Sequence, residues 1–68
     1  MEFQLKDEYI ELDNLLKAAD LAVNGVDAKQ HILSVSVKVN GQVETRIRRK
    51  LRPGDFVEFG KDKVNISA

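Results

Sequence analysis

The alternation of apolar and polar residues is clearest in the middle of the chain, where it predicts two β-strands. Residues 35–39 (VSVKV) and residues 43–47 (VETRI) both place apolar or β-branched side chains at every second position. Successive side chains of a strand point to opposite faces, so each run has one apolar face and one polar face. We therefore expect two neighbouring strands, each with one buried face.

A turn signal, Asn40-Gly41, lies between these two runs and predicts a β-hairpin, because both residues tolerate positive φ. A two-residue turn would pair Lys38 with Val43 and mix the two faces. We expect a three-residue turn instead, with a bulge at the glycine, which brings the valines together and places Lys38 opposite Glu44 or Gln42.

Before the hairpin, the pattern predicts a short strand and two helices. Phe3 and Leu5 alternate with polar residues near the N-terminus, which indicates a first strand. A first helix is expected over residues 11–20, because apolar residues recur there at spacings of three and four. The members of this stripe are Leu12, Leu15, Leu16 and Ala19.

A second helix is expected from Asp27 to Leu33, after the break at Asn24-Gly25. Asn24 or Asp27 is the candidate N-cap, and Gly25 is the candidate left-handed residue that ends the first helix. Ala28 and Ile32 lie four apart and should face the first helix, with Val35 completing the stripe if the helix extends.

After the hairpin, Arg52-Pro53-Gly54-Asp55 has the proline and glycine of a type II turn. Strands are expected at residues 56–59 and 64–66, joined by a turn at residues 60–63. Helices therefore precede most of the strands. We predict one α+β domain, residues 1–68, with two N-terminal helices packed on a small, mainly antiparallel, curved sheet of three to five short strands.

Composition narrows the function classes. The chain has no cysteine, which excludes disulfides, thiolate zinc sites and a cysteine nucleophile. No apolar run approaches the roughly 20 residues that span a membrane, and the acidic N-terminus lacks a secretory apolar region, so we expect a cytoplasmic protein without membrane contact.

Charge is segregated although the net charge is zero. Two lysines and seven acids give residues 1–27 a charge of −5, whereas nine Lys/Arg and four acids give residues 28–68 a charge of +5. A local positive face can attract phosphate even on a neutral protein.

The basic side chains are densest after the hairpin, where five cations fall within seven residues: Arg46, Arg48, Arg49, Lys50 and Arg52. Arginine matches phosphate oxygens in a forked geometry, so this run is a candidate phosphate clamp. The alternative is a solvated edge that blocks pairing between sheets. Arg46 could also pair with Glu44 or with an acid of a helix.

Other chemistry is sparse. His31 is the only histidine, has no partner at metal-binding or catalytic spacing, and is expected on a helix surface. The serines and threonine lack a nearby base, and no phosphate-cradling glycine motif is present, so we expect no enzyme and no cofactor. The phenylalanines fit core packing, while Tyr9 stays open between packing and stacking on a base.

Four segments together resemble the alpha-L RNA-binding domain, which is named for the fourth small-subunit ribosomal protein, and especially its small stand-alone bacterial members. They are IELDNLLKAADL, NGVDAKQHI, VKVNGQVETR and LRPGDFVEF, in this order. The resemblance implies a non-catalytic domain that holds structured RNA between the second helix and the hairpin edge. The family commonly has glycine between the second helix and the hairpin, where this chain has Val35.

Carried over by position, the resemblance implies RNA contacts at Lys29, at Lys38, and along the segment from Arg46 to Arg52. Gln30 is a further candidate contact, because it projects away from the buried stripe of the second helix, within reach of a ligand at the hairpin. Ribosomal RNA (rRNA) is the expected partner, in ribosome assembly or a ribosome-associated role, for a protein that is a monomer. The alternatives are a protein-interaction module that uses the segregated charges, and a DNA-binding role.

Overall fold

The computed structural model describes every residue from Met1 to Ala68 and contains two short helices and seven short strands. In chain order these are β1 (Glu2–Gln4), β2 (Ile10–Glu11), α1 (Leu12–Ala18), α2 (Gly25–Leu33), β3 (Val37–Val39), β4 (Gln42–Val43), β5 (Lys50–Leu51), β6 (Phe56–Phe59) and β7 (Asp62–Ser67).

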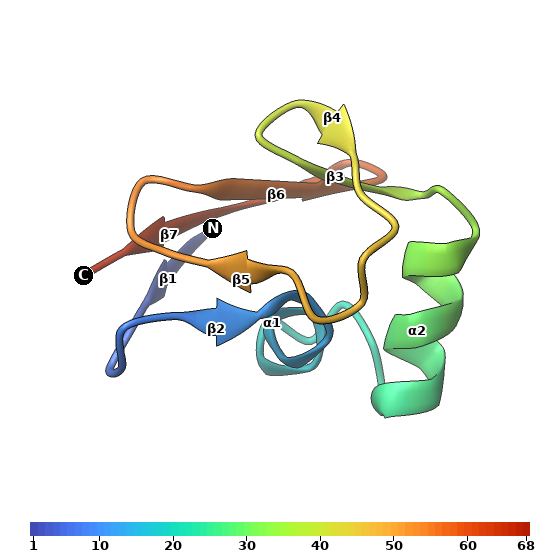
Figure 1. Ribbon diagram of the computed structural model, residues 1–68, viewed down its shortest axis with the longest axis horizontal. Helices are drawn as coiled ribbons and strands as arrows, with labels where there is room; N and C mark the ends of the chain where they lie inside the picture. Colours follow the sequence, from blue (N-terminus) through green and yellow to red (C-terminus); the bar gives the residue numbers. More distant parts are fainter.

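Five of the strands form one mixed sheet in the order β1-β7-β6-β3-β4, and β2 pairs with β5 in a separate antiparallel ribbon (Figure 1). Within the larger sheet β1 runs parallel to β7, and the other neighbours are antiparallel. The α+β class is confirmed. The expected first strand is present as β1, but the predicted N-terminal placement of the two helices is wrong, because β2 as well as β1 comes before α1.

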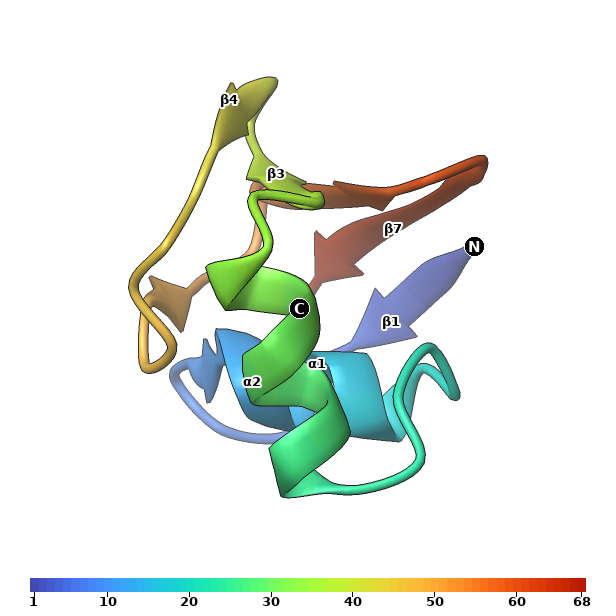
Figure 2. The ribbon, with the colours of Figure 1, turned by 90° about the vertical axis from the view of Figure 1, so that its right-hand side faces the viewer.

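The core lies between the helices and one face of the sheet. Figure 2 shows the two helices crossing each other on the same side of the sheet. The predicted stripe is confirmed, since the three leucines and the alanine of residues 12–19 are buried together with Ala28 and Ile32. Strand residues at alternate positions complete this core: Val37, Val39, Val57, Val64 and Ile66.

The N-terminus of α2 is capped as one of the two alternatives predicts. The Asn24 side-chain oxygen accepts a hydrogen bond from the Asp27 N–H at 2.8 Å, and the Asp27 carboxylate accepts one from the Val23 N–H at 3.1 Å. The expected role of Gly25 is wrong, because Gly25 begins α2. Asp20, with φ 64°, takes the left-handed conformation after α1 instead.

The prediction that Val35 completes the buried stripe of α2 is also wrong. Val35 has φ 56° and is 60% exposed, because the helix ends at Leu33, two residues before it. The Val35 N–H donates to the Ile32 carbonyl, and the Ser36 N–H donates to the His31 carbonyl. These two bonds form a Schellman motif, whose left-handed position is usually glycine, so a β-branched residue here is strained.

The hairpin does not have the register that the alternation of apolar and polar residues predicted. Lys38 pairs with Val43 and Val39 with Gln42 across a two-residue turn, in which Asn40 (φ 55°) and Gly41 (φ 85°) both have positive φ. The expected three-residue turn with a bulge is therefore wrong. The alternation misled because β4 is only two residues long and Val43 is half exposed. Burial of the valines of both strands on one face therefore does not determine the register.

The C-terminal elements follow the prediction more closely. Gly54 has φ 99° and the Asp55 N–H donates to the Arg52 carbonyl at 3.0 Å, as a type II turn requires. The strand expected at residues 56–59 is β6, whereas β7 begins earlier than expected, at Asp62. Neither helix is long and apolar enough to cross a membrane.

Candidate nucleic-acid interface

The basic segment, residues 46–52, is held across the N-terminus of α1 by main-chain bonds. The first-turn N–H groups of a helix have no partner inside the helix. Here the Leu12 N–H donates to the Arg49 carbonyl at 2.9 Å, and the Asp13 N–H donates to the Ile47 carbonyl at 3.1 Å. The end of the segment then pairs as β5 with β2. The backbone that carries the cations is thus fixed to the helical layer.

Glu44, at the start of this loop, is the one charged residue buried in the protein, at 7% exposure. Its carboxylate accepts bonds from the Thr45 and Arg46 N–H groups, from Arg46 Nε and Nη2 at 3.0 Å each, and from Arg49 Nη1 at 2.7 Å. Hydrogen bonds from the Arg46 side chain are the largest cause that lowers the pKa of Glu44 to about 2, with burial opposing them. Glu44 in turn raises the pKa of Arg46.

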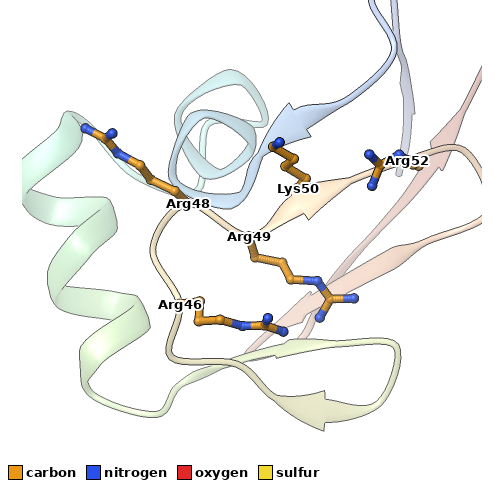
Figure 3. A pocket seen from close by; sticks show the side chains of 5 residues that line it. All are labelled: Arg46, Arg48, Arg49, Lys50 and Arg52. Carbon is orange, nitrogen blue, oxygen red and sulfur yellow. The ribbon is translucent and has the colours of Figure 1, made fainter.

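All five side chains of the predicted cation run line one open hollow of about 450 Å³, which we call the basic hollow. Its members are Arg46, Arg48, Arg49, Lys50 and Arg52, and no hydrophobic side chain lines it. Figure 3 shows the guanidinium groups of Arg46 and Arg49 side by side, while Arg48 extends toward the helices. The whole run is therefore gathered on one surface.

The basic hollow keeps a strong positive charge despite Glu44. Five cations and one carboxylate leave +4 over residues 44–52. Arg46 and Arg49 are the two that form ion pairs, both with Glu44. Arg48, Lys50 and Arg52 have no carboxylate within ion-pair distance, so their charges are available to an anion from solvent.

The remaining predicted site residues are distributed unevenly. Lys29 of α2 lines a second hollow of about 550 Å³ together with Arg46 and Arg48, so it adjoins the basic hollow. Gln30 is exposed on α2 and lines neither hollow. Lys38 lies between two buried valines of β3 and pairs with Glu58, which places it on the outer face of the sheet, away from both hollows.

A contact that the sequence did not predict, between Asn40 and Asp55, fixes the turn at the far end of the basic segment. The Asn40 amide donates to Asp55 at 3.0 Å, and its oxygen accepts from the Phe56 N–H. Burial alone would raise the pKa of Asp55, but hydrogen bonds from the Arg52 N–H and from Asn40 outweigh it and lower that pKa. The two turn motifs of the sequence, Asn-Gly and Pro-Gly-Asp, are thus joined directly.

The other candidate groups are structural in this fold. His31 lies on the surface of α2 as expected, with Nε2 3.2 Å from Asp27 and its ring against Phe59. Phe3 and Phe59 pack on the core as expected. Phe56 does not belong to that cluster, and the ammonium of Lys63 lies 4.4 Å from its ring centre. No group of three His, Cys, Asp or Glu side chains could hold a metal ion.

Comparison with known proteins identifies one family and two relatives. A family model described as the S4 domain matches residues 3–67. The chain is 40% identical over 63 residues to the Escherichia coli K12 protein named "Putative RNA-binding protein YbcJ", covering 93% of this chain and 90% of the relative. The same identity relates it to YbcJ of Shigella flexneri, which is named as uncharacterized.

A solved structure is also similar over almost the whole chain. The solution structure of YbcJ from E. coli, described as revealing an αL motif involved in RNA binding, matches with a TM-score of 0.76. It covers 98% of this chain and 86% of the YbcJ chain, at 40% identity. The fold expected from the residues, an alpha-L motif, is therefore shared with this neighbour.

Proposed function

The chain belongs to the S4 domain family, and on this premise we propose that it is a non-catalytic protein that binds structured RNA through the basic hollow. The single observation that carries the proposal is the convergence of all five cations of residues 46–52 on one surface without an apolar lining. The names of the E. coli relative and of its structure, which both refer to RNA binding, support the same proposal.

The main-chain geometry supports a phosphate-binding role for this surface. The loop that carries the cations is bonded to α1 and β2, so its side chains start from a fixed backbone. Guanidinium groups bind phosphate oxygens in a forked geometry, and such contacts position a protein on nucleic acid without selecting a sequence. We propose that Arg48, Lys50 and Arg52 bind phosphates directly, and that Lys29 extends the contact onto α2.

The test is RNA affinity measured over a series of salt concentrations. Each phosphate that a cation neutralises releases counterions, so about four contacts predict a slope of roughly −3 to −4 for log affinity against log salt. Changing Arg48→Gln together with Lys50→Gln should make that slope shallower by about 1.5. A structured rRNA fragment, labelled for fluorescence anisotropy, is a suitable probe.

The matched control changes the same number of charges elsewhere. Lys61 lies in the β6–β7 turn and Lys63 near the start of β7, and neither lines either hollow. The double variant Lys61→Gln, Lys63→Gln should keep the wild-type slope. Equal slopes for the two double variants would mean that the net charge of the protein, not the basic hollow, determines binding, and the proposal would fail.

A narrower part of the proposal concerns the RNA. We propose rRNA, in ribosome assembly or on the ribosome; this rests on the resemblance to a domain named for a ribosomal protein. Sequencing the RNA that crosslinks to the protein in cells would test it. Recovery of mainly non-ribosomal RNA would remove the ribosomal role and leave RNA binding intact, whereas capture of an acidic protein that survives ribonuclease treatment would favour a protein-interaction module.

A further inference from the structure

The two-stranded ribbon of β2 and β5 has two different faces. Ile10 pairs with Leu51, and both turn toward the core. Because side chains alternate along a strand, Lys50 and Arg52 on either side of Leu51 turn outward. Tyr9, directly before Ile10, turns to that same outer face. The sole tyrosine of the chain is therefore on the surface that carries two cations of the basic hollow.

The contacts of the Tyr9 ring agree with this placement. The Lys50 ammonium lies 5.0 Å from the ring centre, and the Arg52 guanidinium carbon lies 6.0 Å from it. Tyr9 as a residue is 38% exposed, whereas the apolar residues of the core are buried. Packing therefore covers only part of the Tyr9 surface. The neighbouring cations, Lys50 and Arg52, hold the ring beside the basic hollow.

Tyr9 also forms the common wall of two further hollows. One, of about 390 Å³, is lined mainly by apolar side chains, with Phe3, Leu5 and Ile10 beside the tyrosine. The other, of about 460 Å³, is lined by Asp7, Glu11 and Asn14 as well as Tyr9 and Ile10. An apolar, aromatic wall next to hydrogen-bond acceptors suits a flat heterocycle that carries N–H donors on its edge.

We infer that Tyr9 stacks on an unpaired base of the same RNA whose phosphates lie in the basic hollow. This rests on the proposed function. Lys50 and Arg52 line the basic hollow and also lie beside the Tyr9 ring. A nucleotide whose phosphate binds these cations therefore has its base within reach of the ring. Aromatic side chains beside a cationic groove bind unpaired bases by stacking.

The test compares two RNA probes and two substitutions. The first probe is an RNA stem closed by a loop of unpaired adenosines, and the second is the fully paired duplex with the same stem. Tyr9→Leu removes the aromatic ring and keeps an apolar side chain, and Tyr9→Phe keeps the ring. Since Tyr9 is exposed, both variants should fold, which circular dichroism would verify.

The wild type and Tyr9→Phe should prefer the stem-loop to the duplex. Tyr9→Leu should lose roughly 5- to 150-fold in affinity for the stem-loop, the range of one base stack, and little for the duplex. Its salt slope should stay at the wild-type value, because stacking releases no counterions. Because the chain has no tryptophan, Tyr9 is its dominant fluorophore, and its emission should be quenched by the stem-loop and not by the duplex.

The outcomes separate this inference from the proposed function. If Tyr9→Leu binds both probes as the wild type does, and Arg48→Gln with Lys50→Gln still flattens the salt slope, the stacking inference is wrong and the phosphate-binding role stands. If Tyr9→Leu loses the same factor for both probes, the ring only supports the position of Lys50 and Arg52, and the inference is again wrong. Absence of salt-dependent RNA binding in the wild type would overturn both.

Discussion

Replacing Glu44 by glutamine should loosen the part of the basic hollow that Arg46 and Arg49 form. The carboxylate accepts five hydrogen bonds, whereas glutamine offers one acceptor oxygen and turns an amino group toward the arginine donors. A pKa lowered from 4.5 to about 2 corresponds to at most about 3 kcal/mol of stability. Since the Arg46 side chain is 72% exposed, water screens the pair, and we expect a loss of about 1–2 kcal/mol.

The effect of Glu44→Gln should depend on pH in a defined direction. The folded-state pKa of Glu44 lies below its unfolded value, so its contribution is complete above the unfolded value of 4.5 and is lost as the pH falls toward about 2. The wild type should therefore be more stable than the variant at pH 7. More than half of that difference should have disappeared at about pH 3, where most unfolded chains carry a protonated Glu44.

Urea denaturation followed by circular dichroism at several pH values between 7 and 3 would measure this difference. For a domain of this size, 1–2 kcal/mol also corresponds to a melting temperature lower by roughly 5–15 °C. Thr45→Ser, which keeps the backbone N–H that bonds to Glu44, is a suitable control. A difference between wild type and Glu44→Gln that stays constant from pH 7 to pH 3 would refute the assigned role of the Glu44 charge.

Substitutions at three further positions test local features, each by urea denaturation at pH 7. Val35→Gly should stabilise the protein by about 0.5–1 kcal/mol. Glycine removes the strain of a left-handed, largely exposed valine, and this gain is larger than the cost of the more flexible unfolded chain. A loss of stability would show that the Val35 side chain contributes to packing. Asn40→Ala should cost about 1–2 kcal/mol through its lost bonds to Asp55 and Phe56; an unchanged midpoint would show that these bonds contribute nothing. Asn24→Ala should cost about 1 kcal/mol as a lost helix cap, and Asn24→Asp should restore it.

Periodicity was sufficient to predict the elements that bury a continuous stripe. The leucines of α1, the pair Ala28 and Ile32 of α2, and the strand at residues 56–59 were all identified, because each packs against the core along its length. The small β2–β5 ribbon was missed. Two residues on each strand give no periodic signal, and only the pairing of Ile10 with Leu51 shows where the basic segment is fixed.

The hairpin shows where periodicity misleads. The alternation in residues 43–47 predicted a second strand with a buried apolar face, but Glu44 is buried and Val43 is half exposed. Glu44 can be buried here because its carboxylate accepts five hydrogen bonds, three of them from the arginines two and five positions later. Pairing of Arg46 with Glu44 was one of the alternatives that the sequence left open, and the structure confirms it; burial of the pair and the contact with Arg49 were not predicted.

The candidate site was predicted better from charge than from strand geometry. The run of five cations was expected to share one surface, and the structure brings it together in the basic hollow. Lys38 was included because the resemblance places it beside the groove, yet the register of β3 turns it to the outer face of the sheet, opposite Glu58. Contact between Lys38 and RNA therefore stays a prediction that the hollow itself does not support.

The central claim, that RNA phosphates lie in the basic hollow, is tested most directly by titrating ¹⁵N-labelled protein with a structured RNA and following backbone amide and arginine Nε–H signals by NMR. The account predicts that the largest shifts occur at Arg48, Lys50 and Arg52, with smaller ones at Lys29 and none at Lys61. Shifts concentrated on the outer face of the sheet, with the signals of residues 46–52 unchanged at saturation, would contradict it.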